Sequence, residues 1–209
     1  MKTVYTARIG GGLPLPKRLE TWDHSWDYIC FTDEKEKLPQ PWQSRPTKLA
    51  CLTPRLTARF HKANPNAVLD GYDTTIWIDL CFALEEPEKV IKDLGDDEVL
   101  TFRHPDRSSV REEAKVIRSL KKASNLQVDA ILMVLELAGY DDDIPLPATG
   151  LIARRDTIKV IEFNETWWKL IRLFCVRDQM SFGLAAHNAS VSVRFLEGNY
   201  RNHPLVWRD

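Results

Sequence analysis

The sequence lacks the short motifs that usually identify an enzyme class. It contains no GxSxG, no Walker A loop, no Rossmann GxGxxG and no HExxH. These absences remove the usual signatures of serine hydrolases, P-loop nucleotide hydrolases, dinucleotide-dependent oxidoreductases and zinc proteases. The run from Gly10 to Gly12 follows a β-rich segment and is only a weak indication of a nucleotide-binding loop.

Cysteine is scarce, and its spacing argues against a structural zinc site. The four cysteines are Cys30, Cys51, Cys81 and Cys175, and no two of them form a CxxC pair. A zinc site built on thiolates usually needs such pairs. Each cysteine has apolar neighbours, so we expect reduced, buried thiols in a cytosolic protein.

Excess charge of one sign and long apolar runs are also missing. The net charge is −1 over 209 residues, which argues against bulk electrostatic binding of nucleic acid or of anionic membranes. No apolar run approaches membrane-spanning length, and the segment MKTVYTARIGGG has no signal-peptide stretch. We therefore expect a cytoplasmic protein with no transmembrane segment and no nucleic-acid partner. The hydrophobic fraction of 44% is enough for the core of one domain.

Strand and helix patterns alternate along the chain and predict an α/β fold. Strands are expected over residues 4–9, 28–31, 76–78, 99–102, 149–155 and 191–195, and helices over 54–63, 85–94, 109–124 and 128–138. Asp156, Asn164 and Asp178 are each expected to cap a later helix, and the stretch LPQPWQSRP is expected to be a loop. Ligands of such sheets bind beyond the carboxyl ends of strands. The strand ends at Gly10–Gly12, Asp33, Asp79 and His104 should therefore meet on one rim.

Asp79 is the first candidate site residue, because it ends the apolar run Ile76-Trp77-Ile78. Burying a carboxylate without a partner costs several kcal/mol, so Asp79 needs a metal, a backbone cap or a ligand. Position alone leaves two interpretations open: a metal or nucleotide ligand at a strand end, or a carboxylate that caps a turn.

Arg55, Arg59 and Lys62 fall at positions i, i+4 and i+7 and share one face of the expected helix. This face could hold a pyrophosphate. The alternative is a solvated cationic face, which is the commoner outcome for such a pattern.

Three further segments place polar side chains at element boundaries. In HPDRSSVREEA, His104 and Arg107 suit substrate binding, while Glu112 suits a capping box with Ser108 or Ser109. In VRDQMSF, Asp178 is either a simple helix cap or part of a helix N-terminus that faces an anionic or hydroxyl-rich ligand. His203 lies in a polar tail, where a histidine is more often structural, although a histidine near Asp79 would suit a divalent metal.

Four of the seven tryptophans lie in loop-like stretches: Trp22, Trp26, Trp42 and Trp207. They either stack on sugar rings or anchor the loops to the body of the protein.

The order of motifs resembles a known family. VYTARIGG, DYICFTD, ARFHK, TTIWIDLCFAL, FRHPDRSSVREEA, TGLIARRD, WW and RDQMSF follow one another as in the TOD/MUCI-type glycosyltransferase-like family, over roughly Val4 to Phe182. That family is similar in turn to GT-A glycosyltransferases of the glycogenin kind. The resemblance implies a single GT-A-like domain over 1–209, a mixed sheet flanked by helices, with a nucleotide-binding half (1–103) and a sugar and acceptor half (104–209).

The resemblance also implies roles for particular residues. Asp79 falls on the DxD motif that binds a divalent metal and the nucleotide diphosphate, and Lys62 falls on the basic helix before it. Thr149 and Gly150 fall on the strand beside the donor sugar, Asp178 and Gln179 on a DQ pair, and His203 on a late metal-binding histidine. This sequence departs from the motif, because Trp77 and Cys81 stand where the second acid of DxD would be. A site without metal is therefore an open alternative.

These observations lead to one main hypothesis, a glycosyltransferase that moves a sugar from a nucleotide sugar, expected to be a UDP-sugar, to a glycan or other hydroxyl acceptor. Gly10, Gly11, Asp33, Arg59, Lys62 and Asp79 would hold the nucleotide, and Asp79 with His203 would hold Mn²⁺ or Mg²⁺. Thr149, Gly150, His104 and Arg107 would bind sugar and acceptor, and Asp178 and Gln179 would be catalytic. Asp178 is the candidate base of an inverting enzyme; a retaining enzyme needs no such base, and both alternatives stay open.

The alternatives are a non-catalytic nucleotide- or glycan-binding module, and a metal-dependent phosphohydrolase that uses Asp79, His104, Asp106 and His203. A partner chain or a second copy of the protein would assist acceptor recognition.

Overall fold

The computed structural model describes residues 1–35, 37–49 and 52–206. Cys51 and Trp207 lie outside the described residues, so the expectations for them stay untested. The strands are β1 Lys2–Arg8, β2 Asp27–Thr32, β3 Gln43–Pro46, β4 Thr74–Ile78, β5 Val99–Arg103, β6 Pro147–Arg155 and β7 Val193–Leu196. The helices are α1 Pro54–Ala63, α2 Pro87–Leu94, α3 Val110–Ser119, α4 Asn125–Leu137, α5 Ile158–Leu173 and α6 Gln179–Asn188, with a short 3-10 helix η1 Pro65–Ala67.

The seven strands form one mixed sheet in the order β3-β2-β1-β4-β6-β5-β7. Strand β6 runs antiparallel to both of its neighbours, β4 and β5, and every other pairing in the sheet is parallel. The predicted α/β class, with a mixed sheet flanked by helices, is therefore confirmed. The carboxyl ends of β1, β2, β4 and β5 lie on one edge of this sheet, as expected for a common rim.

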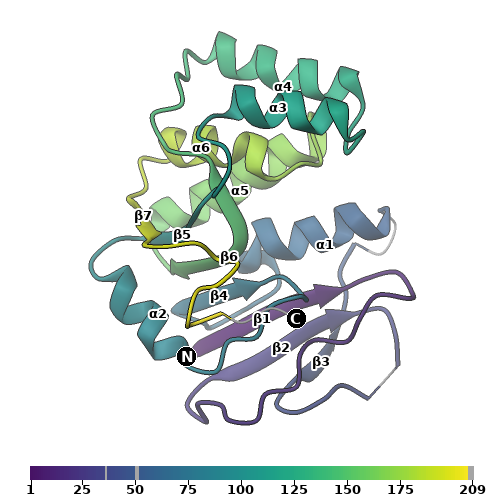
Figure 1. Ribbon diagram of the computed structural model, residues 1–209. Coiled ribbons are helices and arrows are strands. Elements are labelled where there is room, and N and C mark those ends of the chain that lie inside the picture. The colour runs from purple at the N-terminus through teal and green to yellow at the C-terminus, as the bar shows by residue number, and fades with distance from the viewer. Residues whose placement is uncertain (36, 50–51, 207–209) are drawn as a thin grey trace.

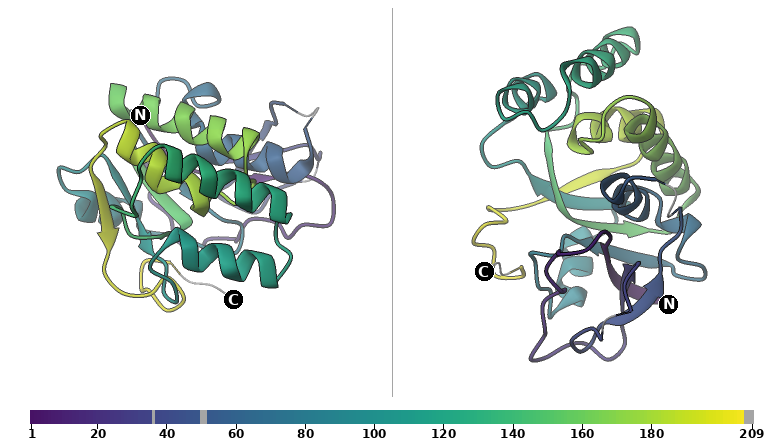
Figure 2. Two further views of the ribbon diagram at one scale, coloured as in Figure 1. Left: turned by 90° about the horizontal axis from the view of Figure 1, so that it is seen from above. Right: turned by 90° about the vertical axis from the view of Figure 1, so that its right-hand side faces the viewer.

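Both faces of the sheet are covered (Figures 1 and 2). Helices α1, α3, α4, α5 and α6 contribute to one apolar core, which contacts Tyr5, Trp77 and Ile152 of the sheet. Helix α2 and the loops after β1 and β4 contribute to a second core around Ile76 and Leu151 on the opposite face. Alternate residues of β4 thus enter different cores, which explains why its central residues are all apolar.

Two expectations from the sequence are wrong. The stretch LPQPWQSRP contains the edge strand β3, which pairs only with β2 and is mostly exposed, so it has no apolar pattern. Residues 158–173 form one helix capped by Thr157, rather than two helices capped by Asp156 and Asn164. Asn164 is fully buried in the middle of α5, where its amide donates to Asn66 Oδ1.

Buried tryptophans anchor the loops. Trp26 donates through its indole nitrogen to Glu88 Oε1, and Trp42 donates to the carbonyl of Lys17. Both side chains are buried, so for them the anchoring interpretation holds. No helix in the described part of the chain is long and apolar enough to cross a bilayer.

Candidate functional site

Two adjoining pockets open at the carboxyl edge of the sheet, one between β1 and β4 and the other between the end of β4, β6 and the start of α6. The chain leaves β1 toward β2 and β3 on one side and returns to β4 on the other, so this is the position where the strand order reverses. Ligands of open α/β sheets bind at such a crevice. We call the pockets the apolar cavity and the polar pocket; Arg59 and Asp79 line both of them.

The apolar cavity has a volume of about 600 Å³ and lies between β1, the start of α1 and the end of β4. Its lining is mainly apolar: Ala7, Ile9, Gly10, Gly11, Leu13, Pro54, Ala58, Trp77 and Leu80, with Arg55, Arg59 and Asp79 as the charged members. Its size and its few polar groups are typical of a small-molecule site.

Gly10 and Asp33 shape the mouth of the apolar cavity. Gly10 has φ +80°, and a Cβ there would lie 2.8 Å from Cβ of Pro54, so a side chain would be both strained and in collision. The amide of Gly10 donates to both carboxylate oxygens of Asp33, at 3.0 and 3.2 Å. Asp33 therefore fixes the glycine loop, and both Gly10 and Gly11 line the cavity.

Asp79 lies where the two pockets meet. Its amide donates to the Gly150 carbonyl at 2.8 Å, which continues the pairing of β4 with β6. Its Oδ1 accepts from Lys62 Nζ at 3.3 Å and from Trp77 Nε1 at 2.8 Å. The side chain is 39% exposed, so the carboxylate is partnered by protein and still faces the pockets.

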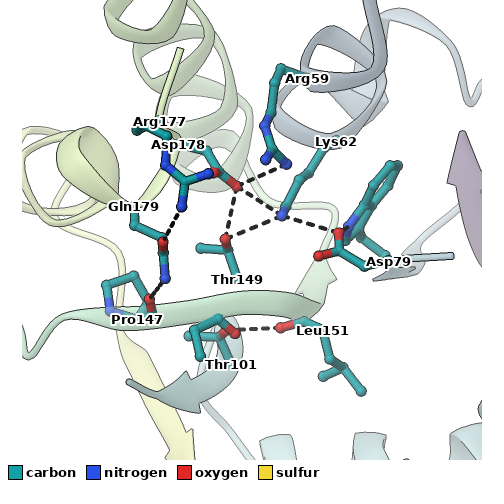
Figure 3. A network of polar contacts seen from close by, with 12 residues as sticks. Arg59, Lys62, Asp79, Thr101, Pro147, Thr149, Leu151, Arg177, Asp178 and Gln179 are labelled. Carbon is teal, nitrogen blue, oxygen red and sulfur yellow. Dashed lines mark hydrogen bonds and ion pairs between the residues drawn. The ribbon is translucent and has the colours of Figure 1, made fainter. Parts of the chain in front are cut away.

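Asp178 is the buried centre of the polar network (Figure 3). Its Oδ2 lies 2.8 Å from Lys62 Nζ and 3.2 Å from Arg59 Nη1, and it accepts from Thr149 Oγ1 at 2.8 Å. Burial alone would raise the pKa of Asp178, but Arg59, Lys62 and Arg177 hold that pKa well below its usual range. Its side chain is only 2% exposed and makes no capping hydrogen bond.

One interpretation of Asp178 is therefore corrected. It occupies the N-cap position of α6, but its carboxylate turns toward α1, where it pairs with Arg59 and Lys62, instead of capping the helix. Its role as a general base stays a prediction. The lowered pKa argues against that role, because such a carboxylate holds a proton weakly.

The Lys62 ammonium is almost completely buried, with a side chain 1% exposed. Its three acceptors are Asp79 Oδ1, Asp178 Oδ2 and, at 3.1 Å, Thr149 Oγ1. An ammonium has three N–H donors, so this set of partners saturates it. The cationic face of α1 is thus turned inward at Arg59 and Lys62 rather than solvated.

Three arginines gather where the pockets join. Arg55 lines the apolar cavity, Arg177 lines the polar pocket, and Arg59 lines both. Burial and the nearby positive charges of Arg177 and Arg59 lower the pKa of Arg55. The Nε atoms of Arg59 and Arg177 are buried and have no hydrogen-bond partner among the described residues. This arrangement is suited to an anionic ligand.

The polar pocket, with a volume of about 230 Å³, is closed by β6 and the start of α6. Gln179 spans the gap between them: its Nε2 donates to the Pro147 carbonyl at 2.9 Å, and its Oε1 accepts from Arg177 Nη2 at 3.2 Å. Gly150 must lack a side chain, because a Cβ there would lie 2.3 Å from Phe82. The structure therefore brings Thr149, Gly150, Asp178 and Gln179 together around one pocket.

His104 and Arg107 lie apart from these pockets. Both line a separate surface pocket at the end of β5, because β6 separates β5 from β4. Burial and the charge of Arg107 lower the pKa of His104. Arg107 forms an ion pair with the buried Glu113, whose other oxygen lies 3.6 Å from Arg177. Among the described residues, Glu113 is what connects Arg107 to Arg177 of the polar pocket.

His203 does not complete a metal site with Asp79. It lies with Asp93 and Glu197 in another pocket, and its ring contacts Phe102 at a centroid distance of 5.0 Å. Among the described residues, no group of three or more His, Cys, Asp or Glu side chains is placed to hold an ion. Asp79 is flanked by an ammonium and Asp178 is enclosed by cations, so the chain's own donors do not fit a divalent metal.

The structure adds residues that the sequence does not single out as site residues: Cys81, Phe82, Arg177 and Tyr200, all lining the polar pocket. Cys81 is only partly buried, unlike Cys30 and Cys175, which are fully buried as expected. Arg177 directly precedes the Asp178-Gln179 pair, and that adjacency is the one sequence signal that points to it.

The chain is similar to several solved structures and to one family model. The solved structures that match include galactosyltransferase LgtC with donor and acceptor sugar analogs (8% identity, TM-score 0.45, covering 93% of this chain and 73% of that one). They include mouse xyloside xylosyltransferase 1 (10% identity, TM-score 0.49, covering 100% of this chain and 96% of that one). They also include the bifunctional glycosyltransferase WbbM (15% identity, TM-score 0.49, covering 93% of this chain and 38% of that one). No curated protein sequence matches. A family model described as TOD1/MUCI70, glycosyltransferase-like domain, matches residues 60–200, more than half of the chain. The chain therefore belongs to the TOD1/MUCI70 glycosyltransferase-like family.

Proposed function

We propose that the protein is a GT-A-like glycosyltransferase that binds a nucleotide sugar across the two adjoining pockets. The observation that carries this proposal is the position of three arginines, Arg55, Arg59 and Arg177, at the junction between an apolar cavity and a polar pocket. A nucleotide sugar has the same order of chemistry: a flat aromatic base, a charged diphosphate and a hydroxyl-rich ring.

The nucleoside would lie in the apolar cavity, where its base would contact the side chains of Ile9, Leu13 and Trp77. The partly exposed Asp79 carboxylate would accept from a ribose hydroxyl, which gives this strand-end acid a ligand as well as its protein partners. All residues that line the apolar cavity come from the first 80 positions, which supports the proposed division into a nucleotide half and a sugar half. The expected base is uracil.

The sugar would lie in the polar pocket against Thr149, Gly150 and Gln179. During transfer the bond from the anomeric carbon to the phosphate oxygen breaks, and the diphosphate leaves with the electron pair. The acceptor oxygen bonds to that carbon and loses its hydroxyl proton to the departing diphosphate. Arg59 and Arg177, whose side chains are mostly buried, would stabilise the charge that develops on the diphosphate. His104 and Arg107 stay predicted acceptor residues, with Arg107 acting through Glu113.

The geometry argues against the phosphohydrolase alternative and leaves the non-catalytic binding module as the second candidate. A phosphohydrolase based on Asp79, His104, Asp106 and His203 has no common site, because these residues line three different pockets. A non-catalytic binding module remains the second candidate, and the lowered pKa of Asp178 favours it, because the carboxylate predicted to act as the base holds a proton weakly.

The test is turnover of nucleotide sugars by the full chain. We expect a UDP-sugar to stabilise the fold, by about 2.7 kcal/mol at a hundred times its dissociation constant, and to be consumed faster when a glycan acceptor is added. Arg59→Met should remove both effects, whereas Lys159→Met, which removes an exposed cation from α5, should keep them. Binding without any acceptor-dependent turnover would favour the binding module. Absence of binding by every nucleotide sugar would remove the proposal.

A further inference from the structure

The junction of the two pockets carries more positive charge than its acids can balance. Four cations surround two carboxylates there: Arg55, Arg59, Lys62 and Arg177 around Asp79 and Asp178. The neighbouring ion pair of Arg107 with Glu113 adds one charge of each sign. The excess of two positive charges remains, and it is partly buried, where repulsion between like charges is costly.

Lys62 occupies the space between the two acids that a metal ion would need. Its ammonium contacts Asp79 Oδ1 at 3.3 Å and Asp178 Oδ2 at 2.8 Å, and its third N–H donates to Thr149 Oγ1. A divalent ion bound to Asp79 would lie close to this ammonium and to Arg59. The electrostatic field of this junction therefore opposes a dication and favours an anion.

From this arrangement we propose that the site binds its diphosphate ligand without a divalent metal, through Arg55, Arg59 and Arg177, with Lys62 as the fixed internal cation. The proposal rests on the proposed function, because it concerns the diphosphate of the same donor. The two phosphates of a nucleotide sugar carry one negative charge each, which matches the excess at the junction. Arg59 and Arg177 line the pockets, and the planar set of N–H donors on a guanidinium suits phosphate oxygens.

The effect of replacing Asp79 distinguishes diphosphate binding by arginines from diphosphate binding through a metal. In a metal site, Asp79 would be the first protein ligand, and its loss would weaken every phosphate ligand. In the arginine site, Asp79 is a negative charge beside a bound anion. Asp79→Asn should then leave the affinity for inorganic pyrophosphate unchanged or increased, since pyrophosphate has no ribose hydroxyl for Asp79 to contact.

The experiment is calorimetric titration of the full chain with UDP and with inorganic pyrophosphate, once in EDTA and once in excess Mn²⁺. We expect the dissociation constant of UDP to agree within about threefold between the two conditions. Arg55→Met and Arg177→Met should each weaken both ligands by about tenfold, the usual effect of losing one charge-assisted hydrogen bond. Loss of Arg55 removes one hydrogen bond, to the Lys122 carbonyl, and loss of Arg177 leaves Glu113 paired with Arg107, so both variants should fold.

Lys159→Met is the matched control, because it removes one positive charge from the exposed side of α5 and should change neither affinity. Binding of UDP only with Mn²⁺, and its loss in Asp79→Asn, would overturn the metal-free proposal while leaving a nucleotide-binding protein. Failure of UDP to bind in either condition would overturn the proposed function itself, and the diphosphate proposal with it.

Discussion

At the scale of single residues, a buried carboxylate organises the cationic face of α1. Asp178 comes from the start of α6, far along the chain, and draws Arg59 and Lys62 inward. The sequence predicts that Arg55, Arg59 and Lys62 share one helix face. It cannot predict whether that face meets solvent or protein, since this depends on which distant acid lies opposite. It predicts Asp79 as a strand-end acid for a similar local reason, but not Lys62 and Trp77 as its partners.

Replacing Asp178 tests this organising role. Asp178→Asn should lower the free energy of unfolding by about 3–5 kcal/mol at neutral pH, because it removes the buried carboxylate that Arg59 and Lys62 share. Chemical denaturation of both proteins measures the difference. The matched control is Asp129→Asn, which makes the same chemical change at an exposed carboxylate on α4 and should have little effect. A loss of similar size in both variants would contradict the organising role of Asp178.

The pH dependence of that difference follows from the direction of the pKa shift. The pKa of Asp178 is lower in the folded state than in the unfolded state, so its contribution is present above the unfolded pKa of about 4. That contribution is lost as the pH falls below about 4 toward the folded pKa. The stability gap between the wild type and Asp178→Asn should therefore narrow in acid, and a gap that widens in acid would contradict the assignment.

Gly150 is a second residue with a steric requirement. Gly150→Ala should destabilise the fold by about 1–3 kcal/mol, because the new methyl group would force Phe82 to move. The double variant Gly150→Ala with Phe82→Leu should recover part of the loss in thermal unfolding. Gly11→Ala is the comparison: a Cβ there meets only the end of the Glu34 side chain, at 3.1 Å, so a smaller loss is expected. Equal losses would count against the Phe82 explanation.

At the scale of elements, the sequence predicts helix α1 with its observed bounds, because Thr53 and Pro54 form a strong local start signal. It does not predict strand β3, because an exposed edge strand of four residues in a proline-rich stretch has no apolar alternation. It divides helix α5 in two, because Asn164 has the residue type of a helix cap. The buried amide of Asn164 in fact bonds to Asn66, a contact that depends on tertiary structure.

The cap of α1 gives a prediction at this scale. Thr53 Oγ1 accepts from the amide of Leu56, and Thr53→Ala should therefore lower the free energy of unfolding by about 0.5–2 kcal/mol. Thr53→Ser keeps the acceptor and should recover most of this stability in urea denaturation. If Ser and Ala behaved alike, the hydroxyl would not be the cause.

At the scale of the whole molecule, the sheet brings segments from both halves of the chain to one edge. The sequence predicts an α/β fold and a polar rim at the strand ends, and the parallel strands β1, β2 and β4 agree with both. It pairs His203 with Asp79, whereas the structure places His203 in another pocket. His104 lies on the predicted rim, but in a separate pocket. Strand β6 lies between β4 and β5 and separates their ends, and no local sequence pattern predicts that position.

The most direct test of the whole account is a crystal structure of the chain with UDP, grown in the presence of a chelator. We expect the uracil in the apolar cavity near Trp77, a ribose hydroxyl at Asp79, and the phosphates against Arg55, Arg59 and Arg177. UDP bound at another surface, such as the pocket of His104, would contradict the site. UDP whose binding requires an ion on Asp79 would contradict the proposal that arginines alone hold the diphosphate.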